Sequence, residues 1–86
     1  MATIIKIEYE ASVFTQAGWR GVTISALADI REDGDGQITE VTAIDGEAPT
    51  GYTSRTGAKR QRYNAAWVAQ HEVGKRKRLA TCTIID

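Results

Sequence analysis

The sequence predicts an α+β fold: a twisted, mainly antiparallel four-stranded sheet with one helix packed on one face. Three segments in the first half of the chain alternate apolar and polar residues, which is typical of half-buried strands. The second half has one stretch with helical spacing, followed by a short β-branched run. The expected order is β-β-β-α-β, in a single α+β domain over residues 1–86.

The first three strands are expected over residues 3–14, 22–30 and 38–45. In the first, one face is apolar, and it consists of Ile5, Ile7, Tyr9, Ala11 and Val13. Residues 16–21 contain two glycines, and residues 31–37 are rich in Asp and Gly. Both stretches have the composition of turns, so the three strands are predicted to form an antiparallel meander.

A loop is expected over residues 46–57, which hold the only proline. A helix is expected over residues 56–73, and the side predicted to face the sheet consists of Ala58, Ala65, Ala66, Ala69 and Val73. Gly74 lies where a helix C-terminal cap is expected. Residues 79–85 are predicted to form the last strand, which pairs beside either the first or the third strand.

Charge is divided between the two parts of the chain. Residues 1–54 hold nine acids and three bases, whereas residues 55–86 hold eight bases and two acids. The chain is neutral only because a net charge of −6 cancels one of +6. A charge division of this size steers partners, so the sequence predicts a protein that works by binding.

Two charged stretches are candidate partner-binding surfaces. The acidic hairpin comprises Asp29, Glu32, Asp33, Asp35 and Glu40. The basic stretch comprises Arg55, Lys59, Arg60, Arg62, Lys75, Arg76, Lys77 and Arg78. Closely spaced carboxylates imitate a phosphate backbone, whereas Lys and Arg beside aromatic residues bind phosphates and bases. The alternative interpretation is that both stretches are ordinary solvated surface.

Trp19 and Trp67 are candidate aromatic anchors for a partner. The other role open to both is to cover an end of a small core, and we favour that role for Trp19. Residues 33–40 have part of the spacing of a calcium loop, but Arg31 and Thr42 occupy positions that need carboxylates. A hairpin turn without a metal is therefore expected there.

An enzyme is not expected, because nothing in the sequence pairs the single histidine, His71, with the single cysteine, Cys82. No cofactor or metal is predicted. One cysteine cannot form an internal disulfide, and no signal-peptide pattern or long apolar run occurs. These features predict a cytoplasmic protein without membrane contact, either a monomer or a homodimer.

The chain resembles a type of protein rather than a motif-defined family. One small domain, no catalytic set and charge sorted into blocks resemble the inhibitors that phages and mobile elements encode, above all anti-CRISPR proteins. The resemblance implies a non-catalytic protein that binds a host defence protein or Cas-type complex in the host cytoplasm and blocks its access to nucleic acid. Two alternatives stay open: a nucleic-acid-binding accessory protein that uses the basic helix and residues 75–78, and an assembly protein that adds its sheet edge to a partner.

Overall fold

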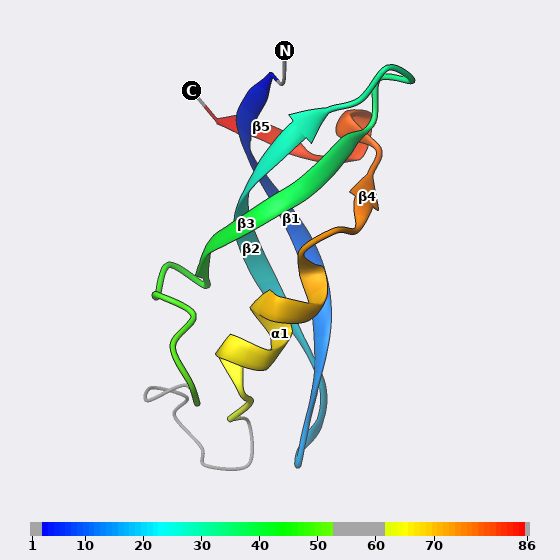
Figure 1. The fold of residues 1–86 in the computed structure, drawn as a ribbon. Helices are drawn as coiled ribbons and strands as arrows, with labels where there is room; N and C mark the ends of the chain where they lie inside the picture. Colours follow the sequence, from blue (N-terminus) through cyan, green and yellow to red (C-terminus); the bar gives the residue numbers. More distant parts are fainter. Residues whose placement is uncertain (1–2, 53–61, 86) are drawn as a thin grey trace.

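The computed structural model describes residues 3–52 and 62–85 (Figure 1). The elements in chain order are β1 Ile4–Thr15, β2 Gly18–Ile30, β3 Gly36–Ile44, α1 Ala65–Glu72, β4 Arg76–Lys77 and β5 Thr83–Ile85, with a 3-10 turn at Leu79–Thr81. The predicted α+β class, with one helix and an antiparallel open sheet, is confirmed. The sheet has five described strands rather than four, in the order β4-β3-β2-β1-β5. No helix among these residues is long and apolar enough to cross a membrane.

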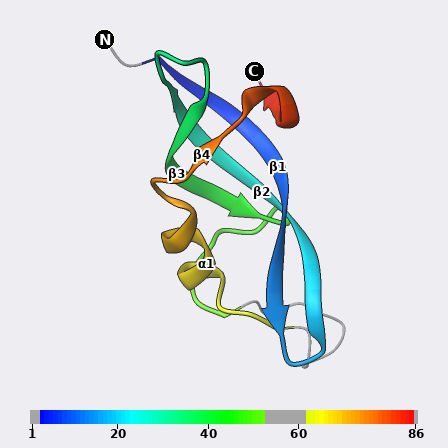
Figure 2. The same ribbon diagram turned by 90° about the vertical axis from the view of Figure 1, so that its right-hand side faces the viewer.

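Strands β1 and β2 form a long hairpin that extends past the end of β3, as Figure 2 shows. The register runs without a break from Ile4↔Asp29 to Thr15↔Gly18, so only Gln16 and Ala17 form the turn. The turn predicted over residues 16–21 was therefore too long. We call the part of the hairpin beyond β3, residues 11–22, the β1–β2 arm. It makes the molecule elongated, with extents of 43 × 21 × 20 Å.

Strand β3 does not alternate as a regular strand does. Its buried apolar residues, Ile38, Val41 and Ile44, are spaced by three. The pairing with β2 skips Thr39 and Thr42, which form two β-bulges. Their hydroxyls donate to the carbonyls of the facing β2 residues at 3.3 and 3.1 Å. Bulges increase the local twist of a strand, so β3 coils across β2 while its apolar residues still face the core.

The helix is shorter than predicted. It begins at Ala65, because the backbone before it is extended and Asn64 caps it. The predicted residues 56–61, with Ala58, lie outside the described part of the chain, and Ala66 and Val73 proved to be exposed. The side that faces the sheet carries the predicted Ala65 and Ala69, together with Val68 and Glu72, which were not predicted there. Gly74 has a φ of +91° directly after the C-cap, as the predicted cap requires.

The chain after the helix crosses from one edge of the sheet to the other. Arg76–Lys77 pairs with β3 at Gly36 and Gln37, whereas Thr83–Ile85 pairs with β1 at Lys6 to Glu8. The strand predicted over residues 79–85 is therefore limited to its last part, beside the first strand. Residues 79–81 form a turn instead, because the chain must cross the buried face, where Leu79 packs over Gly36.

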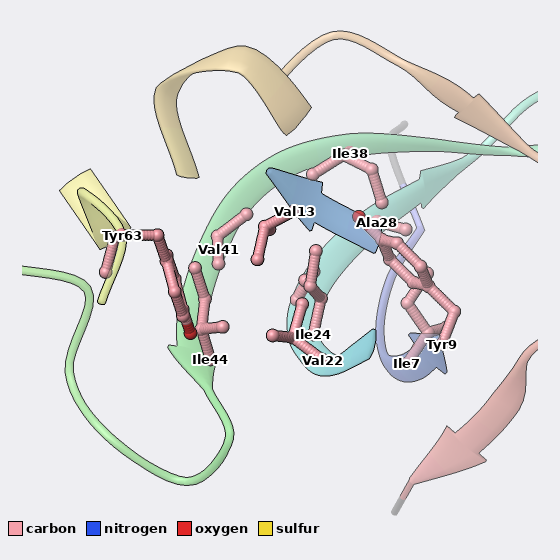
Figure 3. Close-up of a cluster of buried hydrophobic side chains, with 12 residues drawn as sticks. Ile7, Tyr9, Val13, Val22, Ile24, Ala28, Ile38, Val41, Ile44 and Tyr63 are labelled. Atoms are coloured by element: carbon pink, nitrogen blue, oxygen red, sulfur yellow. The ribbon is translucent and has the colours of Figure 1, made fainter. Parts of the chain in front are cut away.

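The core lies on one face of the sheet and is filled mainly by aliphatic side chains from the three long strands (Figure 3). Its largest fully buried members are Ile7, Val22, Ile24, Ile38 and Ile44. Tyr63 and Ala65 close it from the helix side, and Leu79 and Cys82 pack at its other end. The helix and the crossing segment therefore share one face of the sheet.

Gly36 provides a test of this packing. A Cβ at this position would lie 2.9 Å from Leu79 Cδ2 and 3.2 Å from Ala28 Cβ. We expect Gly36→Val to lower the free energy of unfolding by about 1–3 kcal/mol, because the substitution overpacks the contact. Gly21→Val is the matched control: Gly21 is also a strand residue, and a Cβ there meets no described heavy atom within 4 Å. Urea unfolding followed by circular dichroism measures both, and equal stabilities would contradict the close packing.

Candidate functional site

Four large aromatic side chains are exposed around one end of the molecule. Trp19 is 74% exposed, Phe14 67%, Tyr52 64% and Trp67 56%. Phe14 and Trp19 face each other across the β1–β2 arm in an edge-to-face contact, with ring centroids 5.3 Å apart. Tyr52 precedes the helical region in the chain, and Trp67 lies on α1. Burying aromatic surface of this size in a complex is strongly favourable, so this end of the molecule is the candidate site.

The four aromatic residues border one open groove of about 1070 Å³ between the β1–β2 arm and the helix, which we call the arm–helix groove. One wall is residues 12–16, five consecutive residues of β1 and the turn. The other wall is a helical stripe, with members spaced by three or four: Asn64, Trp67, Val68, His71 and Glu72. It continues beyond the C-cap to Lys75. Figure 2 shows the helix lying beside the arm.

The start of the helix is fixed by local backbone contacts. Asn64 forms a β-bridge with Tyr52, and its side-chain oxygen accepts the Trp67 N–H at 3.1 Å. The Ala65 N–H donates to the Gly51 carbonyl at 2.7 Å. These bonds satisfy N–H groups that the first turn of a helix otherwise leaves without a partner. Tyr52 and Trp67 both line the same groove.

The end of the helix is fixed by a buried carboxylate. Glu72 is only 6% exposed, and it accepts the Tyr9 hydroxyl at 2.7 Å and Lys75 Nζ at 2.6 Å. Lys77 Nζ lies 3.7 Å from the same carboxylate and 4.5 Å from the centre of the Tyr9 ring. Burial alone would raise the pKa of Glu72, but the hydrogen bonds from Lys75 and Tyr9 and the nearby Lys77 hold it below the ordinary value. Burial and the Glu72 carboxylate raise the pKa of Tyr9.

A guanidinium, an imidazole ring and an ammonium group accompany the aromatic rings of the groove. The Arg62 guanidinium lies 5.9 Å from the centre of the Tyr52 ring, and the His71 ring stacks on Trp67 with centroids 3.7 Å apart. Lys75 contributes a half-exposed ammonium at the other end of the helical stripe. The one carboxylate among the groove residues is Glu72, which is buried and paired. The exposed charge of the groove is therefore positive.

The predicted acidic residues do gather at the β2–β3 hairpin. Glu32, Asp33 and Asp35 lie in the turn, which has the expected hairpin form. Asp29 is half-buried on β2, where its Oδ1 has no hydrogen-bond partner among the described residues, and Glu40 is exposed on β3. The Asp35 N–H and the Arg76 guanidinium lower the pKa of Asp33.

The structure brings the acidic and basic stretches into contact. Arg76 Nη1 lies 2.7 Å from Asp33 Oδ2, because β4 pairs with the edge of β3 beside the acidic turn. Lys75 and Lys77 lie on either side of the Glu72 carboxylate. Three residues of the basic stretch, Lys75, Arg76 and Lys77, therefore lie beside carboxylates. Arg78 is exposed ahead of the 3-10 turn, and Arg62 lies in the arm–helix groove. Arg55, Lys59 and Arg60 lie outside the described residues.

Trp19 and Trp67 are the predicted site residues that the structure places at the arm–helix groove, together with Arg62 and Lys75. The core role that we favoured for Trp19 is wrong, because register with Phe14 places it on the exposed outer face of the arm. Phe14, Tyr52 and the stacking of His71 on Trp67 were not predicted from the sequence. Phe14 could have been identified, because a large aromatic residue on the polar face of the first predicted strand is expected to be exposed.

No protein-family model matches the chain, and neither does any curated protein or solved structure. The assignment of a site therefore depends on the geometry described above.

The Glu72 cluster makes a pH-dependent prediction. Glu72→Gln is expected to lower the free energy of unfolding at pH 7 by about 1–3 kcal/mol, because the amide forms no ion pair with Lys75 or Lys77. The folded-state pKa of Glu72 lies below the ordinary 4.5, so its stabilisation is fully present above that pH and is lost as pH falls through the folded-state pKa. Urea unfolding at several pH values should show the difference from wild type shrinking in acid. Glu32→Gln, at an exposed turn position, should have no such effect.

Proposed function

We propose that this chain is a non-catalytic binding protein that captures a protein partner in the arm–helix groove. The observation that carries the proposal is the grouping of Phe14, Trp19, Tyr52 and Trp67, all exposed, around that one groove. Monomeric proteins rarely leave several large aromatic residues exposed together unless the patch binds something. Trp, Tyr and Arg are also the residue types that contribute most to binding energy at interfaces.

The walls of the groove support this proposal because both are held in place before a partner arrives. The β1–β2 register fixes one wall, while the Asn64 cap and the Glu72–Tyr9 hydrogen bond fix the two ends of the other. A preformed site loses less conformational entropy on binding than a mobile one. The ordered aromatic rings can therefore contribute most of their burial energy to affinity.

An inhibitor of a host defence complex, the type of protein that the sequence resembles, would use such a groove to hold its target stoichiometrically. The charged stretches then have a secondary role. Because Asp33 pairs with Arg76, and Lys75 and Lys77 surround Glu72, the two signs partly neutralise each other near the sheet edge. We propose that the remaining exposed charges steer the partner toward the protein, and that the aromatic residues of the groove hold it once bound.

A pull-down with the immobilised chain tests the proposal. We expect one dominant protein partner to be recovered from the natural host lysate, and Trp67→Ala to reduce its recovery at least tenfold because the ring borders the groove. Ile84→Ala is the matched control, since Ile84 is 55% exposed but lies on β5, away from the groove. Circular dichroism confirms that both variants are folded. Equal recovery by Trp67→Ala and Ile84→Ala would refute the proposed site.

Single-stranded nucleic acid is a second candidate ligand, favoured by the position of Arg62 and Lys75 beside exposed rings. Proteins that bind single strands combine a positive groove with aromatic stacking platforms. On the leading proposal we expect fluorescein-labelled oligothymidylate to bind negligibly at physiological salt. Anisotropy could instead show tight binding that salt weakens steeply and that Trp67→Ala abolishes. That result would show that the ligand of the groove is nucleic acid rather than a protein.

A further inference from the structure

The free edge of β1 faces the arm–helix groove. Strand β5 pairs with β1 only at Lys6 to Glu8, and no other described strand pairs with β1 on that side beyond Glu8. Successive side chains of a strand point to opposite faces, yet five consecutive residues, 12–16, line the same groove. This lining is expected of a groove that runs along the edge of the strand, where backbone groups are presented, and that reaches the turn at Gln16.

The register identifies which backbone groups face this edge. The Ile30 N–H donates to the carbonyl of Thr3, which lies opposite it in the continued β1–β2 register. Hydrogen-bonded and non-hydrogen-bonded pairs alternate along an antiparallel ladder, so odd-numbered residues of β1 bond to β2. The even-numbered residues Glu10, Ser12 and Phe14 therefore turn their N–H and C=O groups toward the free edge.

We propose that the arm–helix groove accepts an extended, apolar and acidic segment of the partner as an added antiparallel strand on β1, between that edge and α1. This inference rests on the proposed function and specifies how the partner is held. Main-chain hydrogen bonds to an exposed sheet edge, with side chains held in an adjoining groove, are a general mode of peptide recognition.

The dimensions of the two walls fit such a segment. Residues 12–16 of the arm extend for about 13 Å at the usual rise of a strand. Asn64 to Glu72 of the helical stripe extends for about 12 Å at the usual rise of a helix. A segment of about four to five extended residues spans this length. Its two side-chain rows would meet Val68 and Trp67 on the helix side, and Phe14 and Trp19 on the outer face of the arm.

Charge complementarity determines the chemistry of the segment. Arg62 and Lys75 lie at opposite ends of the helical wall, and the one carboxylate of the groove, Glu72, is buried and already paired with Lys75. Lys77 places a second ammonium group beside Glu72, so this cluster has two cations for one carboxylate and keeps a net positive charge. Together with Arg62 it makes the helical wall positive, which attracts an acidic segment and repels a basic one. Apolar side chains at alternate positions contact the aromatic rings.

Selection from a phage-displayed library of random twelve-residue peptides, with the whole chain as bait, tests this inference. Enriched sequences should alternate apolar residues with others and contain more Asp and Glu than Lys and Arg. The best peptide, labelled with fluorescein, then gives a Kd by anisotropy. We expect Ser12→Pro to weaken binding at least tenfold, because it removes an N–H from the free edge without touching the bonds to β2. Ser12→Val keeps that N–H and should retain binding.

A second measurement does not depend on any variant being folded. On addition of the peptide, hydrogen exchange should slow at the amides of Ser12 and Phe14. Failure to enrich peptides, unchanged exchange at these amides, or equal affinities of folded Ser12→Pro and Ser12→Val would overturn the added strand. So would sedimentation that shows a dimer for the wild type and a monomer for Ser12→Pro, because the occupant of the edge would then be a second copy. If Trp67→Ala loses the host partner while Ser12→Pro keeps it, the proposed function stands and only the added strand fails.

Discussion

The hydrogen bond from the Tyr9 hydroxyl to the buried Glu72 carboxylate determines where the helix lies relative to β1. It joins residues 63 positions apart, and the ammonium groups of Lys75 and Lys77 complete the cluster around the carboxylate. An unpaired carboxylate at this burial would be strongly unfavourable, so the cluster stabilises the observed arrangement of the helix, residues 75–77 and β1. The width of the groove beside the arm follows from that arrangement, because the same helix forms its second wall.

Much of the sheet could be predicted from local pattern. The apolar alternation of residues 5–13 correctly predicted the face of β1 that is buried. The Asp-Gly composition of residues 31–37 correctly predicted the second turn. Local pattern gave wrong predictions where contacts between residues far apart in the sequence determine the secondary structure. Gly18 and Gly21 suggested a long turn, but pairing across the arm keeps both in a strand. Residues 76–77 contain only cations, so their pairing with β3 left no apolar signal in the sequence.

The candidate site was only partly predictable for the same reason. Trp19 and Trp67 were identifiable as possible anchors, but their proximity to one groove depends on how the helix lies against the arm. The division of charge along the chain suggested separate acidic and basic surfaces. Arg76 and Asp33 are 43 residues apart in sequence but form an ion pair, because the chain after the helix returns to the β3 edge. Linear charge segregation therefore did not translate into spatial segregation at this edge.

The two bulges of β3 allow the angle between the β1–β2 arm and the helix to change without altering the core. Removing either Thr39 or Thr42 would leave every other β2–β3 pair intact, and Ile38, Val41 and Ile44 would still face inward. Only the coiling of the strand would decrease, since bulges are what increase the local twist. A flatter sheet would hold the arm at a different angle to α1. Single-residue deletions in this strand would thus change the shape of the arm–helix groove at little cost in stability.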